Sequence, residues 1–549
     1  MKLVRNLVEN PLYYKIAIFS IMAPESILVR NDIVSNIINI FFALWALAFL
    51  LNDFFRKKFF LRSPLFPLFL IMFFVFATTN IINFFFSGAQ IMPAASQMTM
   101  LAILFFVFAV PSIEKSKEGK RRELSIISLV IVISTLPLTV FASAAYLLRF
   151  NLFVPFINAR FTYDIAGQTY NAHWYYNFFS LFDNPNFVSS YMIVIVVCAL
   201  LVLLSPLKDL LWLQKTVCFL AIINAVIVFT ALQVRGGTLS FIVGTFAISA
   251  IVVYKLLDLS TLKSIFIKVI SSAIAGIVSG VIMFLVISNL ITLLPSVGEQ
   301  TSEAFENIVH SFRYEPSVPP VVSIGIPVEQ PTDYDLMVTT PPLQPFAGTL
   351  QERDVNFLDN TGSGRVEIWE MYFRGMDFTS FVLGSGPENR MPFYYRFKQN
   401  HPHRYELVSS RFSLARTDVD GNTVIISPHN ELLELLLHNG IFILTLFLFL
   451  ILIVCVMIFV QINLLKIRSK NFWINMVLLF FVASALANGL TLSVIFRFTL
   501  FSQFFWYTIG YISSFGYGSK KSERLLCFVS NAFVSKIFPS IKLEYINRD

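Results

Sequence analysis

Residues 440–460 read GIFILTLFLFLILIVCVMIFV, a run of 21 residues without one charged side chain. A helix of that length rises roughly 30 Å, the thickness of the hydrocarbon core of a bilayer. Residues 64–86, PLFPLFLIMFFVFATTNIINFFF, have the same character. Of the 549 residues, 56% are hydrophobic and 13% are charged, whereas a soluble domain has about 25% charged residues. The sequence therefore predicts an all-α polytopic membrane protein.

The distribution of lysine predicts the orientation of the helices. With the N-terminus inside, every lysine except Lys398 falls on the cytoplasmic side. Membrane proteins retain positive residues in short cytoplasmic loops, so we expect both termini in the cytoplasm. The net charge of +8 then reflects topology and does not indicate nucleic-acid binding. We expect about 12 transmembrane helices, near residues 12–29, 33–52, 64–86, 93–111, 124–147, 187–205, 214–232, 238–256, 268–294, 431–460, 473–495 and 499–517.

The expected helices divide the chain into four parts. These are helices 1–9 with a short exported segment at 148–186, a large exported loop between helices 9 and 10, helices 10–12, and a cytoplasmic tail. Their bounds are 1–294, 295–430, 431–517 and 518–549. Within the large loop, the spacing of apolar residues predicts helices in SEAFENIVHSFRYE (302–315) and SGRVEIWEMYFRGMDF (363–378). The tail is compatible with an amphipathic helix on the cytoplasmic leaflet.

The residues that commonly bind metals indicate no metal site. His401 and His403 alternate in a loop without a carboxylate cluster nearby, so we predict no metal there. The cysteines form no CxxC pair and lie in expected spans or in the tail, which favours apolar packing. They are Cys198, Cys218, Cys455 and Cys527.

Two arginines stand where an anion could meet the membrane surface. Arg235 lies at the exported end of a span and is followed by Gly236 and Gly237. Arg365 lies in the first turn of the helix expected at 363–378, and Trp369 follows four residues later on the same face. A guanidinium offers a permanent charge and a planar set of donors that suits phosphate oxygens. Alternatively, Arg235 is an ordinary interfacial arginine at the end of a span, and Arg365 lies on the solvated face of an amphipathic loop helix.

The stretch SPHNELLELLLHNG, residues 427–440, is expected to begin a long helix that reaches about residue 460. Ser427 is a good N-cap and Pro428 suits the first helical position. His429 would then lie above the hydrocarbon, where an imidazole is suited to act as a general base near neutral pH. His438 is nine residues further along, which places it on the opposite helical face, so we expect that it does not share a site with His429.

Two further motifs have mainly structural explanations. Asn184-Pro185-Asn186 precedes a span and is typical of a turn and helix cap. The glycine motif at 384–386 is too short to indicate a phosphate loop.

Two classes other than an enzyme stay open on this evidence. About twelve spans and several arginines also fit a transporter or flippase for an anionic or lipid-linked sugar. The scarcity of acidic residues in the expected membrane interior disfavours that class, because proton-coupled transporters usually need such carboxylates. An assembly scaffold for an envelope complex is the third possibility.

The order of these motifs resembles the O-antigen ligase and O-antigen polymerase family of bacterial envelope glycan enzymes. The matching elements are DNPNF before a span, RGG after the next span, GRVEIW and GSG in the large loop, and PHNELLELLLHNGI at its end. They cover roughly residues 180–460. The resemblance implies a GT-C-type membrane glycosyltransferase of the bacterial plasma membrane that uses no cofactor and no obligatory metal.

The resemblance also implies substrates and residue roles. The donor would be a glycan on a polyprenyl diphosphate, and the acceptor would be lipid A-core or a growing glycan, with membrane lipids around both. Arg235 and Arg365 would contact the diphosphate, and His429 would deprotonate or orient the acceptor hydroxyl. We place Asn184, Asn186, Trp369 and Asn430 in substrate binding, with Trp369 as our own inference of a sugar platform. Val234 departs from the small hydroxyl residue that the family often has before this arginine.

Overall fold

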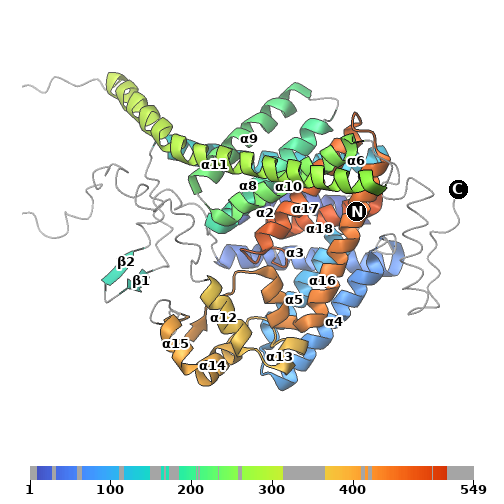
Figure 1. Ribbon diagram of the computed structural model, residues 1–549, viewed down its shortest axis with the longest axis vertical. Coiled ribbons are helices and arrows are strands. Elements are labelled where there is room, and N and C mark those ends of the chain that lie inside the picture. Colours follow the sequence, from blue (N-terminus) through green and yellow to red (C-terminus); the bar gives the residue numbers. More distant parts are fainter. Residues whose placement is uncertain are drawn as a thin grey trace, which may run out of the picture.

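The computed structural model consists mainly of helices that lie side by side (Figure 1). It describes residues 9–27, 32–57, 63, 65–109, 117–148, 162–165, 168–171, 185–205, 207, 211–232, 234–257, 262–312, 365–409, 414–417, 423–497 and 499–515. The predictions for Asn184, Cys527 and the tail 518–549 lie outside these residues. The long helices are α2 Pro11–Ile27, α3 Asp32–Asn52, α4 Phe66–Phe86, α5 Ile91–Ile103, α6 Lys117–Leu147, α8 Pro185–Leu204, α9 Leu211–Leu232, α10 Arg235–Leu256, α11 Leu262–Phe312, α16 Glu431–Leu464, α17 Lys470–Gly489 and α18 Leu500–Phe515.

These helices lie where the apolar runs predicted spans. Within the described residues, ten are long and apolar enough to cross a membrane. The other two, α2 and α18, have 17 and 16 residues. The fold is therefore that of a polytopic, membrane-embedded helical protein, and the number of spans stays a prediction.

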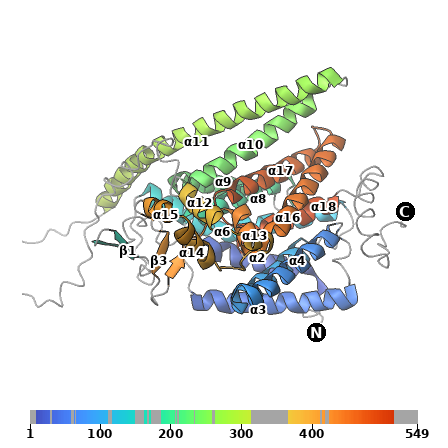
Figure 2. The ribbon, with the colours of Figure 1, turned by 60° about the horizontal axis from the view of Figure 1, so that its bottom comes forward.

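Burial separates central helices from peripheral ones. In α17 and α8, 83% and 78% of the most apolar stretch is buried within the protein, compared with 11% in α10 and in α11. Figure 2 shows α3 and α11 at opposite outer edges, with α8, α16 and α18 between them. An apolar side chain on an outer helix is stable against lipid, so α10 and α11 need little protein cover.

Helix α11 differs from the prediction because it has 51 residues and continues to Phe312. The span expected at 268–294 and the start of the loop helix expected at 302–315 are therefore one helix. At 1.5 Å per residue it is roughly 75 Å long, far more than a bilayer core requires.

The helices confirm the predicted all-α class, and two short antiparallel hairpins are present beside them. Strand β1 Thr162–Ile165 pairs with β2 Gln168–Asn171, and β3 Ala415–Thr417 pairs with β4 Thr423–Ile425. Each strand has only three or four residues, too few for an alternating apolar pattern to register in the sequence.

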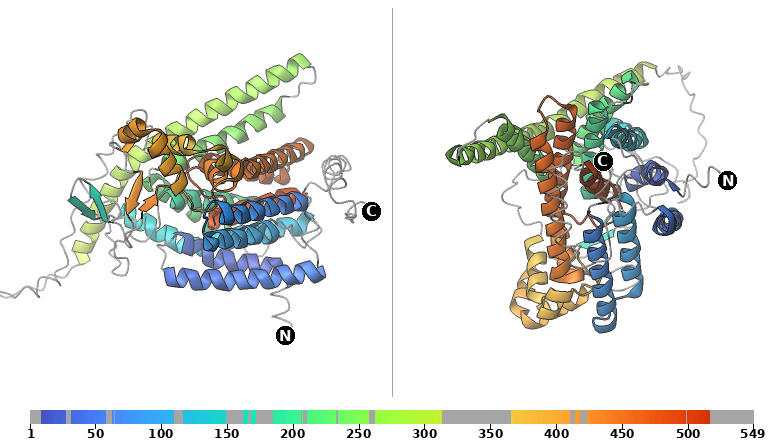
Figure 3. Two further views of the ribbon diagram at one scale, coloured as in Figure 1. Left: turned by 90° about the horizontal axis from the view of Figure 1, so that it is seen from below. Right: turned by 90° about the vertical axis from the view of Figure 1, so that its right-hand side faces the viewer.

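A small unit, here called the loop domain, lies at one end of the long helices (Figure 3). It comprises α12 Arg365–Gly375, α13 Phe378–Leu383, α14 Met391–Asn400, α15 Pro402–Ser409 and the β3–β4 hairpin. Helix α12 confirms the helix predicted at 363–378. The buried core of this unit includes Met371, Tyr372 and Phe393 together with Leu433 and Leu437 of α16. The loop domain thus shares its core with the first turns of a membrane helix.

Helix α16 is broken at Gly440, which contradicts the single straight helix expected to residue 460. Gly440 has φ 78° and ψ −179°, a conformation open almost only to glycine. A Cβ at Gly440 would lie 2.1 Å from the carbonyl oxygen of Val382 in α13. The break lets α13 approach the α16 backbone.

The GSG motif supplies hydrogen bonds to this break. Leu437 accepts a hydrogen bond from the Ser385 N–H at 2.8 Å, and His438 accepts one from the Gly386 N–H at 3.0 Å. The Asn83 side chain on α4 donates to the Leu383 carbonyl at 3.0 Å and to the His438 carbonyl at 3.4 Å. Backbone carbonyls freed by a break in a membrane helix need such donors. The motif has a structural role that its length did not indicate.

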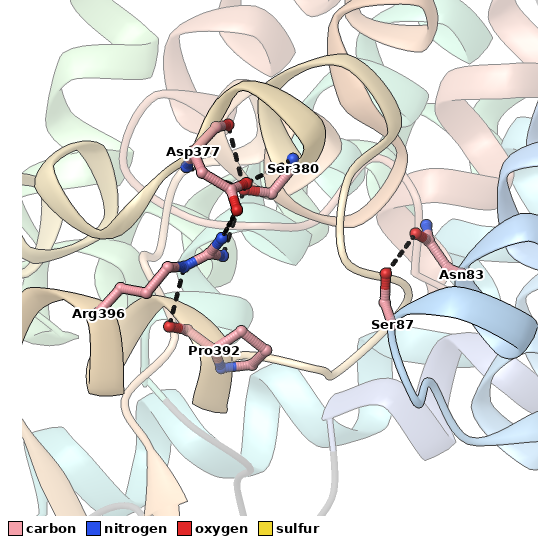
Figure 4. A network of polar contacts seen from close by, with 6 residues as sticks. All are labelled: Asn83, Ser87, Asp377, Ser380, Pro392 and Arg396. Atoms are coloured by element: carbon pink, nitrogen blue, oxygen red, sulfur yellow. Dashed lines mark hydrogen bonds and ion pairs between the residues drawn. The ribbon is translucent and has the colours of Figure 1, made fainter.

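Helix α13 is itself capped at its N-terminus (Figure 4). The Asp377 carboxylate accepts a hydrogen bond from the Ser380 N–H at 2.8 Å, and the Ser380 hydroxyl accepts one from the Asp377 N–H at 3.1 Å. Arg396 on α14 forms an ion pair with Asp377. This reciprocal capping satisfies two orphan backbone donors and orients α13 against the break.

We expect Gly440→Ala to destabilise the protein by at least about 3 kcal/mol, because the new Cβ adds a clash to an unfavourable φ. Gly88→Ala is the matched control, since Gly88 also has positive φ, 64°, but nothing lies within 4 Å of its Cβ position. Thermal unfolding of both variants in detergent is the measurement. Equal melting temperatures for the two variants would contradict the packing role of Gly440.

Candidate functional site

His429 lies in a strained turn between β4 and α16. Its φ is 48°, in the left-handed region that residues with a Cβ seldom adopt. The Ser427 hydroxyl oxygen accepts the His429 N–H at 3.4 Å and donates to the Glu434 carboxylate at 2.5 Å. The turn is therefore held by its own neighbours in sequence.

The helix start differs from the prediction. Asn430 is the N-cap, and its side-chain oxygen accepts the Leu433 N–H at 3.0 Å. Helix α16 begins at Glu431, so Ser427 is not the cap and Pro428 is not the first helical residue. The Asn430 amide also donates to the Leu490 carbonyl at 3.2 Å. Both polar groups of Asn430 therefore bind protein, while its substrate-binding role stays a prediction.

Helix α12 holds the segment before His429 in place. The Trp369 indole N–H donates to the Pro428 carbonyl at 2.8 Å. One turn further along, the Tyr372 hydroxyl donates to the Ile426 carbonyl at 2.5 Å. These bonds give Trp369 a positioning contact, and its role as a sugar platform is still untested.

The same helix brings Arg365 into the site. Arg365 is the first residue of α12, four residues before Trp369. Its pKa is lowered first by burial and then by the positive charge of Arg235. Arg235 at the start of α10 thus acts electrostatically on Arg365 at the start of α12, although 130 residues separate them in sequence.

Arg235 is the first residue of α10 and is exposed. The glycines after it are buried, and a Cβ at Gly236 would lie 2.3 Å from the Thr491 hydroxyl. At Gly237 a Cβ would lie 2.7 Å from the Phe229 ring. The glycines therefore allow the start of α10 to pack closely against α9 and the segment after α17, which places Arg235 at the edge of the site.

The imidazole of His429 is neutral at neutral pH. Its pKa is lowered to about 4, first by burial and then by the positive charge of Arg365. Arg497 and Arg390 act in the same direction, and Glu434 opposes them. A neutral imidazole can accept a proton or a hydrogen bond, as a general base requires. The structure therefore brings His429, Arg365 and Arg235 into one chain of electrostatic neighbours.

Sequence reasoning missed three members of this site. Glu434 in the first turn of α16 lies 3.6 Å from an Arg390 guanidinium nitrogen and 3.8 Å from one of Arg497. Arg390 follows the GSG turn, and Arg497 lies between α17 and α18. The signal for Glu434 was available, because ELLELLL at 431–437 places two acids in an otherwise apolar run. We call these three residues with Arg235 and Arg365 the arginine cluster.

The segment that carries Arg497 is fixed from both sides. The buried Glu431 carboxylate accepts the Ile495 N–H at 2.8 Å and the Phe496 N–H at 3.3 Å. The Trp506 indole N–H donates to the Ile495 carbonyl at 3.0 Å. Arg497 then lies over the Phe187 ring, 5.4 Å from its centroid.

Phe187 connects the cluster to the start of α8, where Asn186 lies. The Asn186 carbonyl accepts hydrogen bonds from the Ser189 and Ser190 hydroxyls at 2.8 and 3.1 Å. The start of α8 thus reaches the arginine cluster through Phe187, and the proposed substrate contact of Asn186 stays a prediction.

His438 has three of the electrostatic neighbours of His429, although we expected the two histidines on opposite helical faces. It lies one turn after Glu434 and interacts electrostatically with Glu434, Arg390 and Arg497. Because His429 precedes the helix in a left-handed turn, a rotation of 100° per residue does not apply to it, and the separation of the two histidines stays a prediction. His438 is 9% exposed, and its Nε2 has no hydrogen-bond partner among the described residues.

The bundle interior holds an ion pair that the sequence reasoning did not anticipate. Lys15 on α2 lies 3.6 Å from Glu123 on α6, and both side chains are buried. Acidic residues are scarce among the spans but not negligible. Within the described residues, no group of three or more His, Cys, Asp and Glu side chains is placed to hold a metal ion.

Comparison of the chain with protein-family models, with curated proteins and with solved structures found no match.

The pKa of His429 predicts a pH dependence of stability. Its folded value of about 4 lies below the ordinary 6.5, so the unfolded chain binds a proton between these values that the folded chain does not. The stability contribution is present above pH 6.5 and lost as the pH falls toward 4. At about 1.4 kcal/mol per pKa unit, the loss is at most about 3 kcal/mol.

His429→Asn isolates this effect, because asparagine tolerates the left-handed turn but does not titrate. We expect the melting temperature of the wild type in detergent to fall more steeply with acidification than that of the variant. Parallel slopes would show that His429 does not carry the depressed pKa.

Proposed function

We propose that this protein transfers a glycan from a polyprenyl-diphosphate donor to an acceptor hydroxyl at the outer face of the bacterial plasma membrane. The observation that carries the proposal is a neutral histidine whose electrostatic neighbour Arg365 is in turn acted on by Arg235, at one end of a bundle of apolar helices. The motif order of the O-antigen ligase and polymerase family supports it further. In this orientation the chain is multi-pass with both termini in the cytoplasm.

The arginine pair suits an anionic leaving group. Within the described part of the chain, the charged neighbour that acts on Arg365 is another cation, Arg235. Two guanidinium groups that act on each other electrostatically repel, and an anion that both contacted would relieve the repulsion. A diphosphate supplies that anion, and its polyprenyl tail would lie among the apolar helices.

The chemistry assigns one role to each group. The acceptor oxygen attacks the anomeric carbon and its proton passes to the His429 imidazole. The bond between the anomeric carbon and the phosphate oxygen breaks, and the diphosphate leaves with the electron pair. Arg235 and Arg365 neutralise the charge that develops on the leaving group, the kind of electrostatic stabilisation that often dominates catalysis. The proton on His429 then returns to water.

The rival is a transporter or flippase, and one observation favours it. The buried Lys15–Glu123 pair is the kind of ionisable group that marks a transport path in some membrane proteins. Reconstitution separates the two functions, because transfer from a purified polyprenyl-linked donor needs no gradient across a vesicle. Substrate movement without product formation would favour the rival.

Ligase and polymerase differ in the acceptor. Deletion of the gene in the native host distinguishes them: a polymerase mutant makes a single capped repeat, and a ligase mutant accumulates full-length polymer on its lipid carrier.

We expect Arg235→Ala, Arg365→Ala and His429→Asn each to lower kcat for transfer by roughly 100-fold or more, the usual cost of losing a charge-stabilising or general-base group. Initial rates with purified protein in detergent are the measurement. Arg374→Ala is the control, because Arg374 lies on the same helix but is 48% exposed and pairs with Glu370. Full activity in all three site variants at normal expression would refute the assignment.

A further inference from the structure

Glu434 is the meeting point of three segments that are far apart in the sequence. Its carboxylate accepts a hydrogen bond from Ser427 at 2.5 Å and pairs with Arg390 and Arg497 at 3.6 and 3.8 Å. These partners come from the turn before α16, the segment after α13, and the segment between α17 and α18. The Glu434 side chain is buried, so its charge depends on these partners.

We propose that Glu434 is the positioning residue of the candidate site: it fixes the His429 turn through Ser427 and holds Arg390 and Arg497 beside the imidazole. The catalytic consequence of this inference rests on the proposed function, whereas the positioning itself does not.

The turn needs such support. A left-handed backbone at a residue with a Cβ persists only where the surroundings determine it. The His429 N–H has the Ser427 oxygen as its acceptor, and the Ser427 hydroxyl in turn donates to Glu434. Glu434 thereby orients the Ser427 hydroxyl so that its oxygen lone pairs face the His429 N–H. Without the carboxylate, the hydroxyl is free to rotate and the turn loses a constraint.

The negative charge of Glu434 also affects the electrostatic environment of His429. The groups that act on His429 are Arg365, Arg390, Arg497 and Glu434, from four different segments, and Glu434 is the acid among them. It compensates Arg390 and Arg497, whereas the charged neighbour of Arg365 is Arg235. The carboxylate therefore offsets part of the positive potential that these arginines place on the imidazole.

The first test measures the position of His429 without any glycan. Diethyl pyrocarbonate modifies neutral, accessible imidazoles, and peptide mass spectrometry gives the rate for each histidine at about pH 7. His403 on α15 is exposed and serves as the internal reference. The variants are Ser427→Ala, Glu434→Ala and Glu434→Gln. Glu370→Gln is the matched control, because Glu370 also pairs with two arginines, Arg374 and Arg404.

We expect Ser427→Ala and Glu434→Ala to raise the rate at His429 several-fold, because the imidazole leaves its buried position. Glu434→Gln keeps an oxygen acceptor for Ser427 and should stay near the wild type, as should Glu370→Gln. Size-exclusion elution and melting temperature establish that each variant is folded. Wild-type rates in folded Ser427→Ala and Glu434→Ala would overturn the proposal. Should Glu434→Ala not fold, Ser427→Ala alone decides.

The second test uses the pH dependence of transfer. Glu434→Gln removes the negative charge that opposes the three arginines, so the acidic limb of the kcat profile should move to lower pH. Glu370→Gln should leave the limb in place. An unmoved limb in Glu434→Gln would refute the electrostatic part of the inference.

The two proposals fail in different ways. If the wild type transfers no glycan, the proposed function fails, and the modification rates still decide whether Glu434 positions His429. If transfer is present but the modification rates do not change, only the inference about Glu434 fails.

Discussion

The structure depends on how one broken membrane helix satisfies its backbone. Gly440 interrupts α16, and the carbonyls of Leu437 and His438 then need donors from outside the helix. Ser385, Gly386 and Asn83 supply them. Because the donors belong to the loop domain and to α4, satisfying the break also fixes that domain on the bundle. The first turn of α16 then places Glu434 in the arginine cluster, and Glu431 against the segment that precedes Arg497.

The site combines groups with opposite electrostatic needs. Burial and nearby arginines keep His429 neutral, which makes it able to accept a proton although it lowers its basicity. The same arginines provide the positive potential that an anionic donor would require. Glu434 moderates this potential, because its carboxylate pairs with Arg390 and with Arg497. The site can hold this much charge because its turn and inter-helix segments are fixed by hydrogen bonds to helices, as those from Trp369 to Pro428 and from Ile495 to Glu431 show.

The sequence was sufficient to predict the helices, because long apolar runs leave few structures possible in a membrane. The apolar helices and the helix at 363–378 were accessible from composition and spacing, whereas a shared site for Arg235, Arg365 and His429 was expected from motif order and stays a prediction. The break at Gly440 was not, since a single glycine in an apolar run is tolerated in many helices and its φ depends on Val382 far away in sequence. Helical rotation could not place His429 relative to His438 either, because His429 lies in a left-handed turn before the helix.

The site residues that the sequence did not reveal show that local sequence patterns carry no information about contacts between distant segments. Taken singly, none of the three residues indicates a site. Arg390 is one arginine after a glycine turn, Arg497 is one arginine between two spans, and Glu434 is one acid in a helix. They belong together because Glu434 pairs with arginines that lie 44 and 63 residues away in the sequence, and no local period encodes such distances. Arg497 nevertheless follows a local rule, because a charge between apolar helices must find water or a partner. An arginine between two membrane helices therefore marks where to search for the buried acid that pairs with it.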